Sequence, residues 1–336
     1  YKNDRFKDLY KQEETMNSKV KVTNGVKTVI GKPEVSVLIA LLFLCVFLSF
    51  SGPYFLTARN IVNIFRQFSL IAILAVGQAL IILTGGIDLS VGSVVGFTAC
   101  FGAWVARLGA SPFLTLLAIL GMGILVGLSN GLLVSKVGIP AFVATLGMMS
   151  ISRGFSLLIT MGVPIHYKPT WISVFGGGYI SIVPVSVLVM LVIVAIGYIF
   201  ANNTVPGRNI YAVGNSEKAA KLSGIQVDRV KTMVFTITGL LAGICGLILL
   251  GQLDGADAFY GDGYELDVIA AAVIGGISLS GGEGSPLGVV VGAALMGVLK
   301  NAFVLLAVPG YWQTVVIGVV IIGAVSIDSL RRKRVG

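Results

Sequence analysis

The residue best placed to do chemistry is a carboxylate between two apolar stretches. Asp88 lies in the segment LTGGIDLSVGS, Leu83 to Ser93. It can accept hydrogen bonds from unpaired N–H groups at the start of the next helix, or from hydroxyl groups of a polar solute. Ser90 can share either role. Gly85 and Gly86 predict that the preceding helix breaks here, because glycine adopts the backbone conformations that end helices.

A second segment repeats this pattern. GGISLSGGEG begins at Gly275 and Gly276 and has Ser278 in the place of Asp88. Both segments follow one apolar stretch and precede another. Glycine-broken helices at matching positions are typical of internal repeats that border a transport path, although chance matching in a glycine-rich chain is the alternative. The shared requirement is a glycine break followed by a polar group, and negative charge is optional in that role.

Other ionisable residues also lie in or beside apolar segments. Each costs roughly 2.5–3.5 kcal/mol at the centre of a membrane helix, so each must face protein, a cavity or the interface. Arg153 can anchor a span or line a pore, Asp267 can cap its helix or line an outer mouth, and Lys300 can extend to the interface. The candidate path and its broken helices therefore comprise Gly85, Gly86, Asp88, Ser90, Thr145, Arg153, Gly275, Gly276 and Ser278.

The composition defines the elements that must position these residues. The chain has 336 residues, of which 56% are hydrophobic and only 12% charged, and its mean hydropathy is +0.94. Soluble domains carry about 25% charged residues, so we predict an all-α, polytopic membrane protein. The net charge of +9 comes from Lys and Arg in the tails and one loop. This pattern indicates membrane orientation and not a nucleic-acid partner.

About ten spans are expected, with both termini on the cytoplasmic side. A polar tail covers 1–33, in which Met16 could be the start, and a single membrane domain covers 34–330 before a basic tail at 331–336. Arg59, Arg66 and Arg107 fit this orientation least well. The expected spans are 35–51, 60–83, 91–108, 113–135, 141–160, 181–201, 232–251, 265–280, 286–306 and 311–327.

The polar loop 202–231 predicts a short helix suited to docking on another protein. Asn215 or Ser216 can cap it, and Gly224 can end it in a left-handed conformation. Glu217 falls in its first turn, and Ala219 and Ala220 give it a patch of small side chains. An ordinary solvated loop helix is the alternative.

The loop 252–264 has acidic residues and no Lys or Arg. Asp254, Asp257 and Asp262, followed by Glu265, could receive an extracellular binding protein through charge complementarity. A solvated loop is again the alternative. No catalytic pair of nucleophile and base appears, and the three cysteines and one histidine have no metal-ligand spacing.

Four ordered motifs resemble the permeases of ribose-type ABC importers. EKAAKLSGI, from Glu217, resembles the EAA coupling loop that inserts into the ATPase subunit. GGIDLSVGS, PAFVATLGMMSISRG from Pro140 and GYELDVIAAAVIGGISLSGGEG from Gly263 resemble other stretches of the same family, over a likeness from about residue 35 to the end. The resemblance assigns ATPase coupling to Gly214, Asn215, Ser216, Glu217, Ala219, Ala220 and Gly224.

The resemblance implies a monosaccharide importer in a bacterial inner membrane. Its partners would be an ATPase subunit that carries ATP and Mg, a second permease subunit, identical or paralogous, a periplasmic or extracellular sugar-binding protein, and the lipid bilayer. LSGGE, from Leu279, imitates an ATPase signature, but the sequence has no P-loop. We therefore expect a transport subunit with no cofactor and no enzyme activity of its own.

Two other functions stay open at this stage. An ion-coupled secondary carrier would use Asp88 and Asp267 to carry protons or sodium ions. An ABC permease of the same fold could instead carry nucleosides or branched-chain amino acids.

Overall fold

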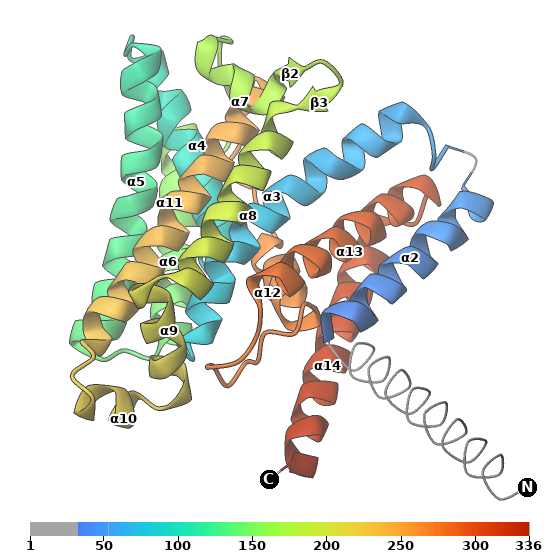
Figure 1. Cartoon of the computed structure of the whole chain (residues 1–336). Helices are drawn as coiled ribbons and strands as arrows, with labels where there is room; N and C mark the ends of the chain where they lie inside the picture. The colour runs from blue at the N-terminus through green and yellow to red at the C-terminus, as the bar shows by residue number, and fades with distance from the viewer. Residues whose placement is uncertain (1–32, 53, 336) are drawn as a thin grey trace, which may run out of the picture.

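The computed structural model describes residues 33–52 and 54–335 and is mostly helical, as expected (Figure 1). The polar tail and Met16 lie outside the described residues. The helices are α2 (Pro33–Ser51), α3 (Ala58–Leu83), α4 (Val91–Arg107), α5 (Pro112–Leu132), α6 (Ala141–Thr160), α7 (Val174–Gly177), α8 (Val185–Asn203), α9 (Val205–Asn215), α10 (Glu217–Leu222), α11 (Val227–Leu253), α12 (Tyr264–Ile274), α13 (Pro286–Leu305) and α14 (Gly310–Val335).

Every expected span corresponds to a helix, but the helices differ in length. Six helices within the described part of the chain are long and apolar enough to cross a membrane, and three shorter apolar helices lie at 35–51, 91–107 and 310–323. The expected span 265–280 is wrong in its extent, because α12 ends at Ile274. Eleven helical residues extend only about 16 Å, roughly half of a bilayer core. The count of ten spans stays a prediction.

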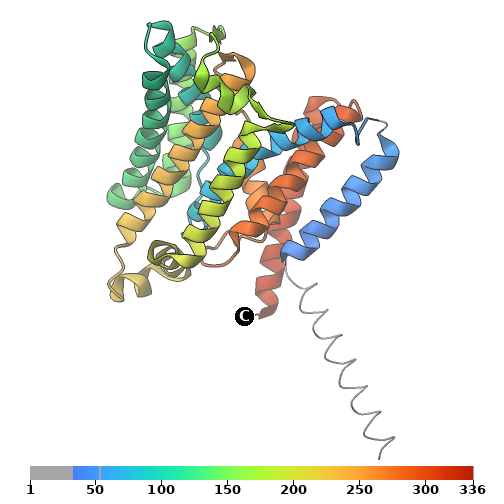
Figure 2. The same cartoon turned by 45° about the horizontal axis from the view of Figure 1, so that its top comes forward.

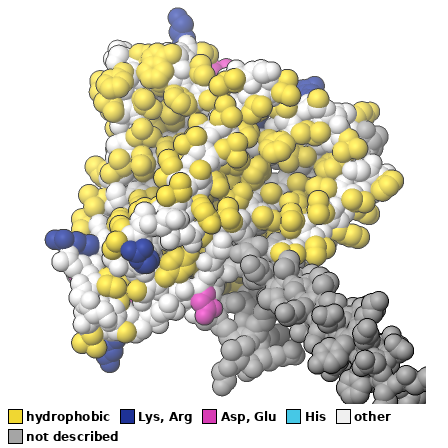
Figure 3. All heavy atoms as spheres, viewed as in Figure 1, with side chains coloured by type: hydrophobic (Ala, Val, Ile, Leu, Met, Phe, Trp, Pro, Cys, Tyr) yellow, Lys and Arg dark blue, Asp and Glu magenta, His cyan; other side chains and the backbone are white. Residues whose placement is uncertain are grey.

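Helix α3 forms the centre of the fold. Every residue from Phe68 to Leu83 is buried, since α8, α11, α12 and α13 pack around it. By contrast α5, α6 and α8 expose large apolar side chains such as Leu125, Phe142 and Leu191. In Figure 3 apolar side chains cover most of the visible face, as expected for helices that face lipid.

Helices α5 and α11 approach each other through glycine. Gly123 and Gly127 of α5 face Gly239 and Gly243 of α11, and a Cβ at Gly127 would overlap the Phe235 carbonyl oxygen. Small residues four apart permit such close contact in membranes, where burial of apolar surface gives little drive for association. The high glycine content therefore has a packing role here.

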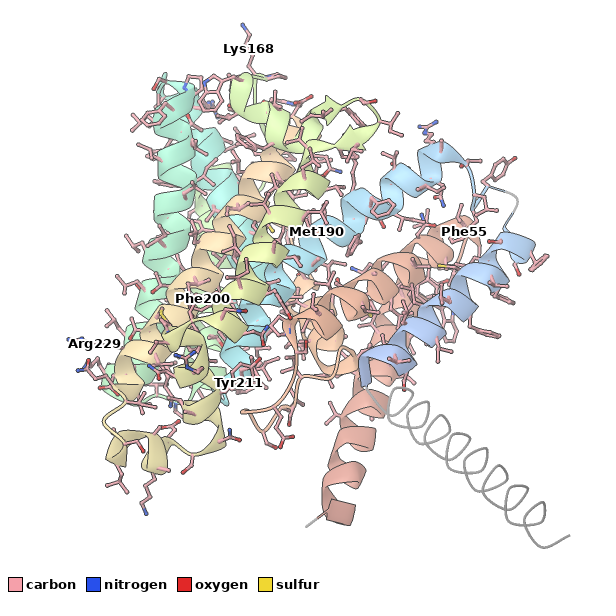
Figure 4. All side chains as sticks on the ribbon, in the orientation of Figure 1. Phe55, Lys168, Met190, Phe200, Tyr211 and Arg229 are labelled. Atoms are coloured by element: carbon pink, nitrogen blue, oxygen red, sulfur yellow. The ribbon has the colours of Figure 1, made fainter. Side chains whose placement is uncertain are left out.

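The two ends of the bundle carry different connections (Figures 1, 2). At one end, called the α7 end, β1 (Ile165–His166) pairs with β4 (Gly255–Ala256), and β2 (Tyr179–Ile180) pairs with β3 (Val183–Pro184). At the other end, called the α10 end, α9 and α10 connect α8 to α11. Figure 4 shows Lys168 at the α7 end, pointing away from the bundle, and Arg229 at the α10 end.

Two details at the α10 end correct the expectations from sequence. The segment expected to be a loop at 202–231 is mostly helical, because α9 precedes the short helix and α11 starts at Val227. At the C-terminus, α14 continues beyond residue 327, the expected end of its span, and into the segment 331–336 that was expected to be a basic tail. The side chains of that basic segment lie outside the described part.

Candidate functional site

Helix α10 begins and ends at the capping residues predicted from the sequence. Ser216 precedes its first residue, and the Ser216 Oγ accepts a hydrogen bond from the Ala219 N–H at 3.2 Å. Gly224 has a φ of +82°, the left-handed conformation expected after a helix. Glu217 forms an ion pair with Lys231 of α11, which fixes the start of α10 to the bundle.

The expected patch of small side chains on α10 is divided between two faces. Ala219 is exposed, whereas Ala220 is buried against the protein itself. The two alanines therefore do not form the single docking patch that was predicted. Alanine at 220 instead allows α10 to lie close to the neighbouring helices.

Helix α9, which the sequence analysis missed, joins α10 to the core. Its Tyr211 hydroxyl donates to the Gly284 carbonyl at 3.1 Å, and Figure 4 shows Tyr211 near the α10 end. Burial raises the pKa of Tyr211, so the hydroxyl stays protonated and remains a donor at neutral pH. The signal that could have located α9 is Thr204 followed by Pro206, a helix N-cap with proline in the first turn.

The end of α9, the end of α3 and the segment 275–285 meet at one place, which we call the glycine junction and define by Leu83, Gly85, Gly214, Gly281 and Gly282. The Gly282 N–H donates to the Leu83 carbonyl at 3.0 Å. A Cβ at Gly214 would overlap both that carbonyl and Gly282, and a Cβ at Gly281 would lie 3.0 Å from the Gly85 nitrogen. Both glycine-broken motifs therefore touch each other and the connection to α10.

Asp88 is buried and organises the turn before α4. Its Oδ1 accepts from the Ser90 N–H at 2.7 Å and from the Ser90 hydroxyl at 2.6 Å. Ser90 is the N-cap of α4, and its side chain makes no capping bond. The expectation that Asp88 caps α4 directly is therefore wrong, because Asp88 binds the residue that precedes the helix.

Polar side chains from other helices hold this turn. The Asn130 amide donates to the Ser90 hydroxyl at 2.9 Å, and the Thr145 hydroxyl accepts from the Leu89 N–H at 3.1 Å. The Gln78 amide, oriented to satisfy both of its ends, bonds the N–H and the carbonyl of Asp88 at 3.2 Å each. The space between Asp88, Ser90, Asn130 and α11 leaves no room for a water molecule. We call the side chains of Gln78, Asp88, Ser90, Asn130 and Thr145 the polar layer, and it is closed in this conformation.

A cavity of about 450 Å³ lies at the α10 end. Its walls include Gly85 and Gly86, the start of α6, and Glu217 and Lys221 of α10. The Lys136–Asp228 ion pair, at 3.0 Å, also lies beside it. Pockets of this volume accommodate small molecules, so a polar solute that passed the glycine break would have space here.

Ser278 makes the same local bond as Asp88. Its Oγ accepts from the Ser280 N–H at 3.3 Å, two residues ahead, and the side chain is buried. Gly276, and not Gly275, has the left-handed conformation that ends α12, with a φ of +91°. Gly275 instead packs against Gly288 of α13, where a Cβ would overlap the backbone.

Arg153 of α6 holds the connection between α11 and α12. Its guanidinium donates to the carbonyls of Ala258 and Tyr260, and it pairs with Asp262 at 3.3 Å. This connection passes close to α4, because a Cβ at Gly92 would overlap the Gly261 carbonyl. Arg153 is therefore an anchor for the connection, the alternative that the sequence analysis left open.

The acidic residues expected to form a docking surface do not share one environment. Asp254 is exposed and ends α11, Asp257 accepts from the Phe259 N–H at 2.7 Å, and Asp262 faces Arg153. Glu265 is half-buried, and its Oε2 has no hydrogen-bond partner among the described residues. Of these four residues, only Asp254 is exposed and makes no side-chain hydrogen bond or ion pair with the described residues.

Sequence reasoning did not pair Asp267 with Lys300. Asp267 of α12 is buried, and its Oδ2 forms an ion pair with Lys300 of α13. Thus Asp267 neither caps its helix nor extends to the surface, and Lys300 does not extend to the interface. The two residues lie 33 positions apart, and only the packing of α12 on α13 brings them together.

Comparison with known proteins identifies the family. The family model for the branched-chain amino acid transport system permease component matches residues 60–325. The chain is 40% identical over 302 residues to the ribose import permease protein RbsC of Escherichia coli (strain K12), covering 88% of this chain and 93% of that one. It is also 40% identical over 292 residues to RbsC of Bacillus subtilis (strain 168), covering 86% and 91%.

A third relative, the D-allose transport system permease protein AlsC of Escherichia coli (strain K12), is 37% identical over 297 residues, 87% of this chain and 90% of that one. No solved structure matches the chain. The family match and the apolar helices establish a multi-pass membrane protein. The chain belongs to the family of branched-chain amino acid transport system permease components.

Proposed function

We propose that this chain is the membrane subunit of an ATP-driven importer of a monosaccharide. Relatives that match nearly the whole chain are named as ribose and allose permeases, which favours a sugar over the amino acids in the family's name. A neutral sugar needs hydroxyl partners and no charged site. The buried polar residues Ser90, Asn130 and Thr145 supply such partners beside the glycine break.

The observation that carries the proposal is the glycine junction. A separate ATPase subunit, with its ATP and Mg, would dock on α10 at the cytoplasmic face. Movement of α10 would pass through α9 to Leu83 and Gly282, the ends of the two broken motifs. The first motif borders both the closed polar layer and the 450 Å³ cavity, and the second motif touches the first at the junction. A movement at the junction would therefore open one of these spaces while it closes the other.

This model assigns the remaining partners and orientation. The α10 end, where α9 and α10 carry Arg208, Lys218 and Lys221, would face the cytoplasm of a bacterial inner membrane. The α7 end would face the periplasm or cell exterior and receive the sugar-binding protein. A second permease subunit would complete the membrane domain, with lipid-facing helices such as α5 and α6 around it.

The test is uptake of radiolabelled ribose, and then allose, by cells in which this chain, its ATPase and its binding protein replace the native ribose system. We expect uptake that stops when ATP is depleted and persists when a protonophore collapses the ion gradients. Uptake that stops with the protonophore while ATP is maintained would support an ion-coupled carrier and refute the proposal. Competition by leucine but not by sugars would assign the chain to amino-acid transport.

A further inference from the structure

A second polar cavity lies at the α7 end, apart from Asp88 and the glycine junction. Its volume is about 340 Å³, and its walls come from α3, α11, α12, α13 and α14. The polar lining residues are Arg66, Gln67, Gln252, Tyr264, Lys300 and Gln313. A group of this kind among apolar helices needs a functional reason, since polar side chains are costly there.

Both cations that line this cavity have partners within the protein. Lys300 pairs with the buried Asp267, and its Nζ lies 5.6 Å from the centre of the Tyr264 ring. The guanidinium of Arg66 lies 4.7 Å from the Tyr179 ring centre, and its Nη2 is 3.5 Å from the Gly177 carbonyl. Each cation therefore already has a protein partner, and the cavity does not require an anion.

Two polar atoms of lining residues are buried without a hydrogen-bond partner among the described residues. One is an acceptor, the Gln252 Oε1, and one is a donor, the Arg66 Nε. A buried polar atom without a partner is destabilising, so a ligand that supplies the partner is favoured.

A hydroxyl group meets both needs, because it donates one hydrogen bond and accepts others. A phosphate or carboxylate could accept from Arg66 but would face the Gln252 oxygen. A cation could bind that oxygen but would face Arg66 and Lys300. The Tyr264 ring adds an apolar surface of the kind that packs against the C–H face of a sugar ring.

We propose that this cavity binds a neutral polyhydroxyl solute, the transported sugar itself, before it reaches the closed layer at Asp88. The inference rests on the proposed function and adds a binding site to it. The Gln252 oxygen accepts from one sugar hydroxyl, Arg66 donates to another, and Tyr264 packs against the ring. The Asp267–Lys300 pair positions the α12 and α13 walls.

The first test is cysteine protection in the complete complex in proteoliposomes. Gln313→Cys places a thiol at the cavity, in a background where Cys45, Cys100 and Cys245 are replaced by alanine. Lys168→Cys, at the same end but directed away from the bundle, is the matched control (Figure 4). We expect ribose at twice its dissociation constant to slow maleimide labelling of Gln313→Cys about threefold and to leave Lys168→Cys unchanged.

The second test removes one acceptor. Gln252→Leu keeps the size of the side chain, and its loss of a hydrogen bond should raise the half-protecting ribose concentration about tenfold. Gln226→Leu, an exposed glutamine before the opposite end of α11, is the control and should change nothing.

The outcomes separate the site from the function. Absence of protection, an unchanged half-protecting concentration in Gln252→Leu, or equal protection by ribose 5-phosphate would overturn the site. Ribose uptake by the parent complex, measured in the same proteoliposomes, reports on the proposed function independently. Uptake without protection refutes the site alone, whereas absence of uptake with ribose and with allose refutes the function.

Discussion

The two glycine-broken turns share a local hydrogen bond but differ in length and in the parts of the protein that they contact. Asp88 and Ser278 each accept a hydrogen bond from the N–H two residues ahead. After Asp88, helix α4 begins three residues later, whereas after Ser278 the chain continues irregularly until α13 begins at Pro286. The first turn is fixed inside a closed polar layer. The second extends to α9 and forms much of the glycine junction.

The difference shows what each position needs. An aspartate or a serine can satisfy an N–H two residues ahead, so negative charge is not what the turn requires. The long segment 275–285 needs Gly281 and Gly282, whose φ values are +83° and +74°, because it must fit against Gly214 and Asn215. The short turn depends on side-chain bonds, and the long one depends on backbone contact.

The largest effect is expected from Gly214→Leu. A side chain there would overlap the Leu83 carbonyl and Gly282, both of them backbone, so neither turn could keep its place at the junction. We expect sugar uptake and transport-coupled ATPase activity to be abolished. Gly147→Leu in α6, which has open space around it, is the matched control and should retain both. Normal uptake in Gly214→Leu would refute the junction as the coupling route.

A smaller effect is expected from alanine at the left-handed glycines. Gly85→Ala meets no neighbour and should cost only the backbone penalty, about 1–2 kcal/mol. Gly282→Ala adds an overlap with Asn215 and should cost more. Thermal unfolding of the purified complex in detergent, combined with ATPase assays, measures both. Equal losses in the two variants would show that contact with α9 adds nothing.

The Asp88 variants separate hydrogen bonding from charge. Asp88→Ala leaves the Ser90 N–H and hydroxyl without their acceptor and should destabilise the protein by about 1–3 kcal/mol. Asp88→Asn keeps an acceptor oxygen, so we expect less destabilisation and retained ATP-dependent uptake. Asp254→Ala, an exposed residue at the end of α11, controls for loss of a carboxylate. Loss of uptake in a stably folded Asp88→Asn would show that charge is required.

Ser278→Ala should have the smallest effect. Its bond to the Ser280 N–H is long, 3.3 Å, and the Glu283 and Leu83 carbonyls still hold the surrounding backbone. We expect a loss of about 0.5–1.5 kcal/mol in thermal unfolding and near-normal uptake. A loss as large as that of Asp88→Ala would show that the second turn also depends on side-chain bonds.

Much of the α10 end could be predicted, because its signals are local. Ser216 and Gly224 mark a cap and a stop within one short segment, and both behave as expected. The similarity of the two motifs was also visible in the sequence, but the equivalence of their individual glycines was not. A Gly-Gly pair leaves open which glycine takes the left-handed conformation, and the structure uses the first at Gly85 and the second at Gly276.

Local sequence patterns predicted the class of protein, the place of each apolar helix, the two breaks and the capped short helix α10. These follow from hydropathy, charge and capping, which act within one or two turns of chain. Three features depend on tertiary contacts: the breaks meet at Gly214, α12 is half a span, and Lys300 neutralises Asp267. Such contacts depend on which helix faces pack together, and no local pattern encodes a partner that lies far along the chain.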